Sequence, residues 1–210
     1  MLFNALSMSP QAVLVSVLAV VYALTVHEFS HAWAAYSLGD PTARYQGRLT
    51  LNPLAHLEFF GTLMLLLAGF GWGKPVPVNV YNLRWRKWGE TAVSLAGPVA
   101  NFVSVIFFII IYNILYPFLP ANNLLSLFLL SLILINLVLG VFNLIPLPPL
   151  DGSKVLFAVL SDRYADFKHR LAVNGPWILL ALILLDNFAG INIFGHIFSF
   201  FINLISFFIK

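Results

Sequence analysis

The segment Leu24-Thr25-Val26-His27-Glu28-Phe29-Ser30-His31 lies inside an apolar run that extends from about residue 10 to residue 38. Pro10 suits the start of a helix, and Gly39 with Pro41 is typical of a helix end. A helix that crosses a bilayer needs roughly 20 apolar residues, so this run is long enough to cross. The sequence therefore predicts a membrane-spanning helix that carries two histidines and a glutamate.

The composition agrees with a membrane protein. Of the 210 residues, 60% are hydrophobic and only 9% are charged, whereas about a quarter of a soluble domain is charged. The net charge of +3 rests on a few loop residues, and it gives no argument for a nucleic-acid partner. There are no cysteines, which excludes disulfides, thiolate metal sites and cysteine nucleophiles.

Further apolar segments predict more helices. Residues 59–70 would make a helix only about 18 Å long, so we interpret this segment as re-entrant. Residues 153–170 are polar and predict a short interfacial helix. The remaining long segments that predict membrane-spanning helices are 90–119, interrupted at Gly97-Pro98, then 123–145, 171–185 and 191–209.

Two short stretches predict strands. Residues 45–51 alternate in polarity, and residues 74–80 contain prolines that restrict them to an edge strand. The predicted fold is therefore an all-α polytopic membrane protein with about five transmembrane helices, a re-entrant segment and short membrane-associated β-strands. We expect one membrane-embedded domain over residues 1–210, with a catalytic core at about 20–156 and accessory helices at 157–210.

The basic residues orient this arrangement. Lysine and arginine are found after the first helix, around residues 74–87 and 154–170, and at the C-terminus, but not in the loops at 112–123 and 186–190. The positive-inside rule then predicts an external N-terminus, a cytoplasmic C-terminus and a site nearer the cytoplasmic side.

The spacing His27-Glu28-x-x-His31 indicates a metal site. Residues four apart share one face of a helix, so two imidazoles can bind one ion while Glu28 reaches a water molecule beside it as general base. Polar groups in a membrane helix are costly and are functional by default. The alternatives are a structural polar cluster and a proton-relay or ion-transport site.

A zinc site needs a third protein ligand and an open position. The other histidines and membrane-associated acids are His56, His169, His196, Glu58, Glu90, Asp151 and Asp186. Asp151 is the strongest candidate, because it follows the proline-rich break Pro146-Leu147-Pro148-Pro149 at the end of an apolar helix, where unwound backbone lines protein or a wet cavity. The alternative is an aspartate that merely caps a helix, with Gly152 supplying a turn.

Two distant motifs together resemble one family. His27-Glu28-x-x-His31, followed by Asn143-x-x-Pro146 and Leu150-Asp151-Gly152, is similar to the site-2 protease family of intramembrane zinc metalloproteases. Gly97-Pro98-x-x-Asn101 resembles that family's intervening signature. The stretches 47–56 and 73–79 resemble its compact bacterial or archaeal branch, which lacks a PDZ domain. The resemblance covers residues 20 to 156.

The resemblance implies roles for single residues. His27, His31 and Asp151 would bind one Zn²⁺, Glu28 would be catalytic, and Asn143 would hold substrate backbone or the oxyanion. We further expect Asn101, Pro146, Pro148 and His56 to contact substrate. The expected partners are a membrane-protein substrate and the lipid bilayer, in a prokaryotic cell membrane. A metal or ion transporter with the same ligands and a non-catalytic membrane scaffold remain the alternatives.

Overall fold

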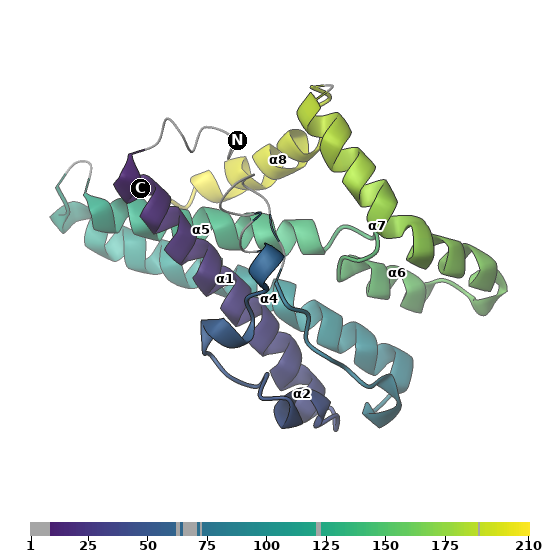
Figure 1. The fold of residues 1–210 in the computed structure, drawn as a ribbon. Helices are drawn as coiled ribbons and strands as arrows, with labels where there is room; N and C mark the ends of the chain where they lie inside the picture. The colour runs from purple at the N-terminus through teal and green to yellow at the C-terminus, as the bar shows by residue number, and fades with distance from the viewer. Residues whose placement is uncertain (1–8, 62–63, 65–70, 72, 121–122, 189) are drawn as a thin grey trace.

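Three long helices, α1, α4 and α5, pack against one another and form the core of the chain (Figure 1). The computed structural model describes residues 9–210 except 62–63, 65–70, 72, 121–122 and 189. Its helices are α1 (Pro10–Ser37), α2 (Thr42–Tyr45), α4 (Arg86–Leu115), α5 (Leu124–Asn143), α6 (Gly152–Val159), α7 (Ala165–Phe188) and α8 (Ile193–Ser206). Single 3₁₀ turns occur at Pro53–Ala55, Val80–Asn82, Tyr116–Phe118 and Asp162–Tyr164.

Helix α4 shows why this bundle belongs in a membrane. One face of α4 is buried against α1 and α5 through residues that include Val105, Phe108 and Tyr112. The opposite face is also apolar and is more than half exposed, at Val99, Val103, Ile106, Phe107, Ile110 and Ile114. A soluble helix would carry polar residues there, so this face requires an apolar solvent.

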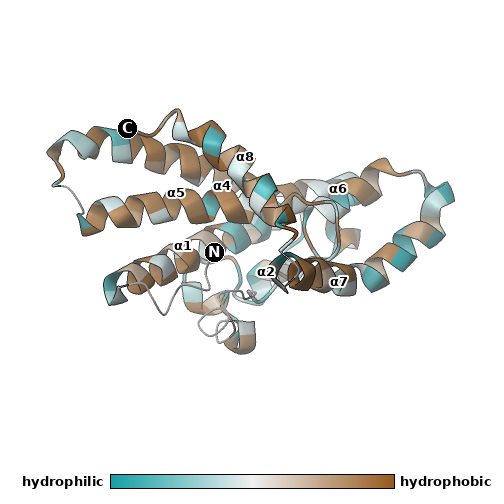
Figure 2. Cartoon of the chain, turned by 90° about the horizontal axis from the view of Figure 1, so that it is seen from above, coloured by the Kyte–Doolittle hydropathy of each residue, from teal (hydrophilic) through white to brown (hydrophobic). Residues whose placement is uncertain are grey.

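Among the residues that the structure describes, four helices are long and apolar enough to cross a membrane. They are α1, α4, α5 and a segment that includes most of α7, at residues 162–186. Figure 2 shows that brown, apolar residues predominate along the core helices, with teal residues interspersed among them. The sequence predicted about five spans, but within the described part of the chain α8 is only 14 residues long, or about 21 Å.

Helix α8 returns along the core, so the C-terminus ends beside α4. The ring of Phe194, at the start of α8, lies 5.8 Å from the ring of Phe142 near the end of α5. The backbone N–H of Lys210 donates to the side-chain oxygen of Asn113 at 3.1 Å. Asn113 lies at the end of α4 remote from Arg86. The C-terminus thus lies at the end of α4 opposite to the basic residues that begin this helix, whereas the sequence predicted a cytoplasmic C-terminus on the side of those residues.

The predicted strands are not found in the residues that the structure describes. Over 45–51, Tyr45 ends α2 and the rest forms turns and bends. Residues 74–79 have no regular secondary structure; two prolines keep this segment extended, and the structure pairs it with no strand apart from an isolated bridge between Leu57 and Gly73 just before it. Most of the predicted re-entrant segment 59–70 lies outside the described residues.

Helix boundaries were predicted more closely than interruptions. α1 begins at Pro10, as expected, and the side chain of Asn123 caps α5 by accepting from the Leu125 N–H at 2.7 Å. α4 continues through Gly97-Pro98 without interruption. The predicted interfacial helix at 153–170 is instead divided between α6, a 3₁₀ turn and the start of α7.

Two buried polar residues hold the extended segment 74–79 against the end of α1. Asp40 is fully buried and accepts from the backbone N–H of Asn79 at 2.6 Å and from the Asn82 amide at 3.0 Å. Arg48 is also buried and donates to the carbonyl oxygens of Lys74 and Pro75. These contacts satisfy the backbone by side chains instead of by a neighbouring strand.

Candidate metal centre

Three ligand atoms from two distant segments converge between α1, α4 and the start of α6. The Nε2 atoms of His27 and His31 lie 3.0 Å apart. Oδ2 of Asp151 lies 3.1 Å from the first and 3.3 Å from the second. All three atoms fall within 4.8 Å of one another. Two imidazoles and one carboxylate are a donor set that suits zinc.

Hydrogen bonds on the far side of each ring fix how the imidazoles present themselves. Nδ1 of His27 lies 2.6 Å from Oδ1 of Asn101, and Nδ1 of His31 lies 2.7 Å from the carbonyl oxygen of Val93. Both partners are acceptors, so we assign the ring hydrogen to Nδ1 in each neutral histidine. Both Nε2 atoms then offer lone pairs toward the same point. Outer contacts of this kind orient histidines that bind metals.

Asp151 completes the set as an ionised carboxylate. Oδ1 accepts from the Ser94 hydroxyl at 3.1 Å, while Oδ2 is buried and has no hydrogen-bond partner in the described part of the chain. Three converging lone pairs repel one another unless a cation lies between them.

The aspartate does not cap a helix. Asp151 stands directly before α6, at the N-cap position, but its side chain makes no capping hydrogen bond. It faces the two histidines across the bundle instead. The structural alternative that the sequence left open is therefore not the arrangement found.

Gly97 gives the imidazoles the space they occupy. A Cβ atom on this residue would lie 2.6 Å from Nε2 of His31 and 2.7 Å from Nε2 of His27. Any side chain there would force the rings or α4 to move. The close approach of α4 to α1 at the Gly-Pro motif thus belongs to the metal centre.

Glu28 lies beside the ligands on the next position of α1. A Cβ on Gly73 would lie 3.9 Å from its Oε1, so the carboxylate reaches the start of the extended segment. Its Oε2 is buried without a hydrogen-bond partner among the described residues. The Glu28 carboxylate is close enough to His31 and Arg48 to interact electrostatically with both side chains. Burial lowers the pKa of the Arg48 guanidinium.

The other predicted site residues are placed differently from one another. Asn101 is fully buried behind His27 and not at a surface. His56 is also fully buried, with Nε2 located 2.8 Å from the Thr50 carbonyl oxygen. The Asn143 amide donates to the Leu139 carbonyl oxygen at 3.0 Å, in the last turn of α5. Pro146 is exposed, while Pro148 packs on the backbone of α7 at Gly175.

Sequence reasoning missed two polar residues that lie behind the ligands. Ser94 donates to the carboxylate and to the backbone carbonyl oxygen of Asp151. Asn136, on α5, is fully buried and accepts from the Asn101 amide at 2.9 Å. An asparagine in the middle of an apolar span was the available signal, because such groups are costly in a membrane.

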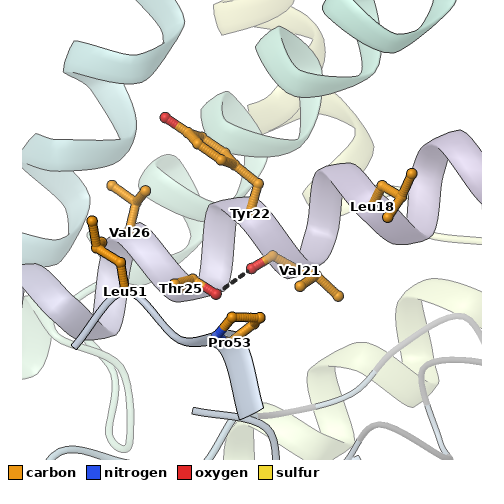
Figure 3. A pocket seen from close by; sticks show the side chains of 7 residues that line it. All are labelled: Leu18, Val21, Tyr22, Thr25, Val26, Leu51 and Pro53. Carbon is orange, nitrogen blue, oxygen red and sulfur yellow. Dashed lines mark hydrogen bonds between the residues drawn. The ribbon is translucent and has the colours of Figure 1, made fainter. Parts of the chain in front are cut away.

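A cavity of about 420 Å³ lies against another face of α1 (Figure 3). Leu18 and Thr25, which line it, lie on nearly the opposite side of the helix from His27. The Thr25 hydroxyl points to the Val21 carbonyl oxygen, at 2.6 Å. The other lining residues are Val21, Tyr22, Val26, Leu51 and Pro53. The cavity is thus separate from the converging ligand atoms.

This chain is a helical membrane bundle that carries two histidines and a glutamate on one span and an aspartate shortly after another span. These features define its class as an intramembrane metalloenzyme. Comparisons with known proteins place the chain more narrowly. The profile of Peptidase family M50 matches residues 114–185, a range that contains Asn143 and Asp151.

Relatives extend the similarity to most of the chain. The Bacillus subtilis protein named "Putative zinc metalloprotease YwhC" is 42% identical over 160 residues, which are 74% of this chain and 71% of that protein. "Putative zinc metalloprotease Rip2" of Mycolicibacterium smegmatis is 30% identical over 77% of this chain and 62% of its own length. "Zinc metalloprotease MJ0392" of Methanocaldococcus jannaschii is 34% identical over 55% of this chain and 33% of its own length. No solved structure matches.

The chain belongs to peptidase family M50, the site-2 protease family.

Proposed function

We propose that His27, His31 and Asp151 bind the catalytic zinc ion and that Glu28 is the general base of peptide-bond hydrolysis. As a member of family M50, the chain is an intramembrane zinc metalloprotease. The observation that carries the residue assignment is the convergence of three ligand atoms within 3.3 Å of one another. Zinc in such a site lowers the pKa of a water molecule and polarises a carbonyl group.

The side chains around the ion then have separate tasks. Glu28 takes a proton from the attacking water and passes it to the leaving amine. Asn101 and the Val93 carbonyl oxygen keep the two rings in one tautomer. We assign Asn101 to positioning and not to substrate contact, because it is fully buried and each of its polar atoms has a protein partner. Asn143 remains a candidate for holding substrate backbone or the oxyanion.

The substrate is a membrane-spanning or membrane-proximal protein segment. Gly73, next to Glu28, directly precedes the segment 74–79, and extended backbone beside a catalytic carboxylate suits pairing with an unwound peptide. The exposed Pro146 is a further candidate contact, whereas Pro148 and His56 are buried and would need movement of α7 or of the 50–57 loop.

We place the site nearer the cytoplasmic face of a prokaryotic membrane. His27 is ten residues from the Ser37 end of α1 and seventeen from Pro10, which corresponds to about 15 Å and 26 Å. The basic residues Arg44, Arg48, Lys74, Arg84, Arg86 and Lys87 all follow the nearer end, which the positive-inside rule assigns to the cytoplasm.

Zinc content and proteolysis together test the proposal. Detergent-purified wild type should hold about one zinc per chain by elemental analysis, and His31→Ala and Asp151→Ala should each lose it. Cleavage is measured by co-expression with tagged single-span membrane proteins. Glu28→Gln should keep zinc but cleave none of them. Zinc retained in Asp151→Ala would defeat the ligand assignment, and cleavage by Glu28→Gln would defeat the general base.

A further inference from the structure

A chain of buried amides connects the middle of α5 to the first histidine. The Asn136 amide N–H donates to the Leu132 carbonyl oxygen at 2.8 Å, and its oxygen accepts from the Asn101 amide at 2.9 Å. The oxygen of Asn101 lies 2.6 Å from Nδ1 of His27. Both asparagines are completely buried. The chain thus runs from a backbone carbonyl on α5 through α4 to α1.

Only one direction of donation satisfies this chain. A backbone carbonyl accepts and never donates, so the Leu132 oxygen requires the amide N–H of Asn136. The oxygen of Asn136 then faces Asn101, which must turn its own N–H toward it. The Ala23 carbonyl oxygen, 3.2 Å from the same nitrogen, imposes the same orientation. Asn101 is left with an oxygen toward His27, which must donate from Nδ1.

On the other side of the His27 ring, the Asp151 carboxylate favours the opposite tautomer, with the hydrogen on Nε2. Nε2 of His27 lies 3.1 Å from the Asp151 carboxylate, which would attract a hydrogen on Nε2. A histidine protonated there cannot bind a metal through Nε2. The amide chain therefore opposes Asp151 and keeps the lone pair where the ion is bound.

We propose that Asn136 is a positioning residue of the metal centre, which acts through Asn101 to hold His27 in the Nδ1–H tautomer. This inference rests on the proposed metal-binding role of His27. Because Asn136 touches Asn101 and not the ring, its effect on the metal must pass through that second asparagine.

Zinc affinity of the purified protein, measured by competition with a chelator, tests the proposal. Loss of an outer contact typically weakens metal binding 10–100-fold, so we expect about tenfold for Asn136→Leu and more for Asn101→Leu. The double variant should bind zinc no more weakly than Asn101→Leu alone, since residues in one network are not additive. Ser131→Ala is the matched control, because it removes a hydrogen bond to the carbonyl four residues earlier on α5, away from the chain of amides.

The tautomer itself gives a second readout, independent of zinc and of proteolysis. Two-bond ¹H–¹⁵N correlation spectra of metal-free protein with labelled histidine, at a pH where the rings are neutral, should show His27 protonated at Nδ1. Asn136→Leu should shift it toward Nε2, while Ser131→Ala should not. If Asn136→Leu does not fold, Asn136→Ala takes its place, since alanine removes the amide oxygen that faces Asn101 without adding volume.

Two results would overturn the inference: an unchanged tautomer and zinc affinity in the folded Asn136 variant, or losses that add in the double variant. Failure of the proposed function has a different signature. Wild type that shows the Nδ1–H tautomer but binds no zinc, or binds zinc without cleaving, leaves the positioning role intact.

Discussion

Gly97 on α4 stands so close to His31 on α1 that a single added carbon would lie 2.6 Å from the ring nitrogen that faces the metal position. The same carbon would lie 2.7 Å from Nε2 of His27. The packing of two membrane helices and the geometry of the metal centre are therefore one feature. A residue in a helix–helix contact becomes a determinant of metal binding.

We expect Gly97→Ala to lower zinc affinity at least tenfold, because displaced ligands lose the geometry that the ion requires. Ala92→Val is the control, since it adds carbon at an exposed position of the same helix. Competition with a chelator measures both variants. Wild-type affinity in Gly97→Ala would show that the helices separate at little cost.

Ser94→Ala should also weaken zinc binding, by about tenfold. The Ser94 hydroxyl lies 3.1 Å from Oδ1 and 3.0 Å from the backbone oxygen of Asp151, and it leaves Oδ2 directed at the histidines. Ser104→Ala provides a control on the same helix, because Ser104 bonds to the Ala100 carbonyl oxygen and to Tyr22 away from the site. Equal zinc affinity in both variants would contradict a positioning role for Ser94.

The metal ligands could be predicted from the sequence, but Ser94 and Asn136, which lie behind the ligands, could not. His27 and His31 are four residues apart on one helix, a local relation that spacing alone reveals. Asp151 required a family resemblance, because it is more than a hundred residues away. Ser94 and Asn136 depend on how three helices are rotated against one another, which the apolar sequence around them does not specify.

The extended segment 74–79 failed as a predicted strand for a related reason. The prolines describe an extended edge backbone, and the structure shows an irregular segment there with no partner strand among the described residues. They do not say what will satisfy its hydrogen bonds. Asp40 and Arg48, from the loops after α1, supply side chains in place of a partner strand.

Asp40 should make stability dependent on acid pH. Although burial opposes ionisation, hydrogen bonds from Thr42, Asn82 and Asn79 lower the pKa of the Asp40 carboxyl below 3.8. A lowered folded-state pKa stabilises the fold above the unfolded-state value, and the contribution is lost as pH falls through the folded-state value. We therefore expect Asp40→Asn to melt several degrees lower at pH 7, and we expect this difference to shrink progressively as the pH falls below the unfolded-state value of about 3.9.

Thermal unfolding in detergent from pH 7 to pH 3 measures this effect. Asp166→Asn, at an exposed acid in the first turn of α7, should change neither the melting temperature nor its pH dependence appreciably. Parallel curves for wild type and Asp40→Asn across the whole range would refute the assigned role.

The position of the C-terminus can be tested because the chain has no cysteine. Lys210 bonds to Asn113, and Phe118 follows on the same end of α4. We expect Lys210→Cys and Phe118→Cys to react with a membrane-impermeant thiol reagent from one side of sealed vesicles. Tyr81→Cys, 86% exposed just before the start of α4, should react only after the vesicles are opened or inverted. If Lys210→Cys labels together with Tyr81→Cys, the C-terminal helix crosses the membrane as a fifth span, and the contact with Asn113 does not form.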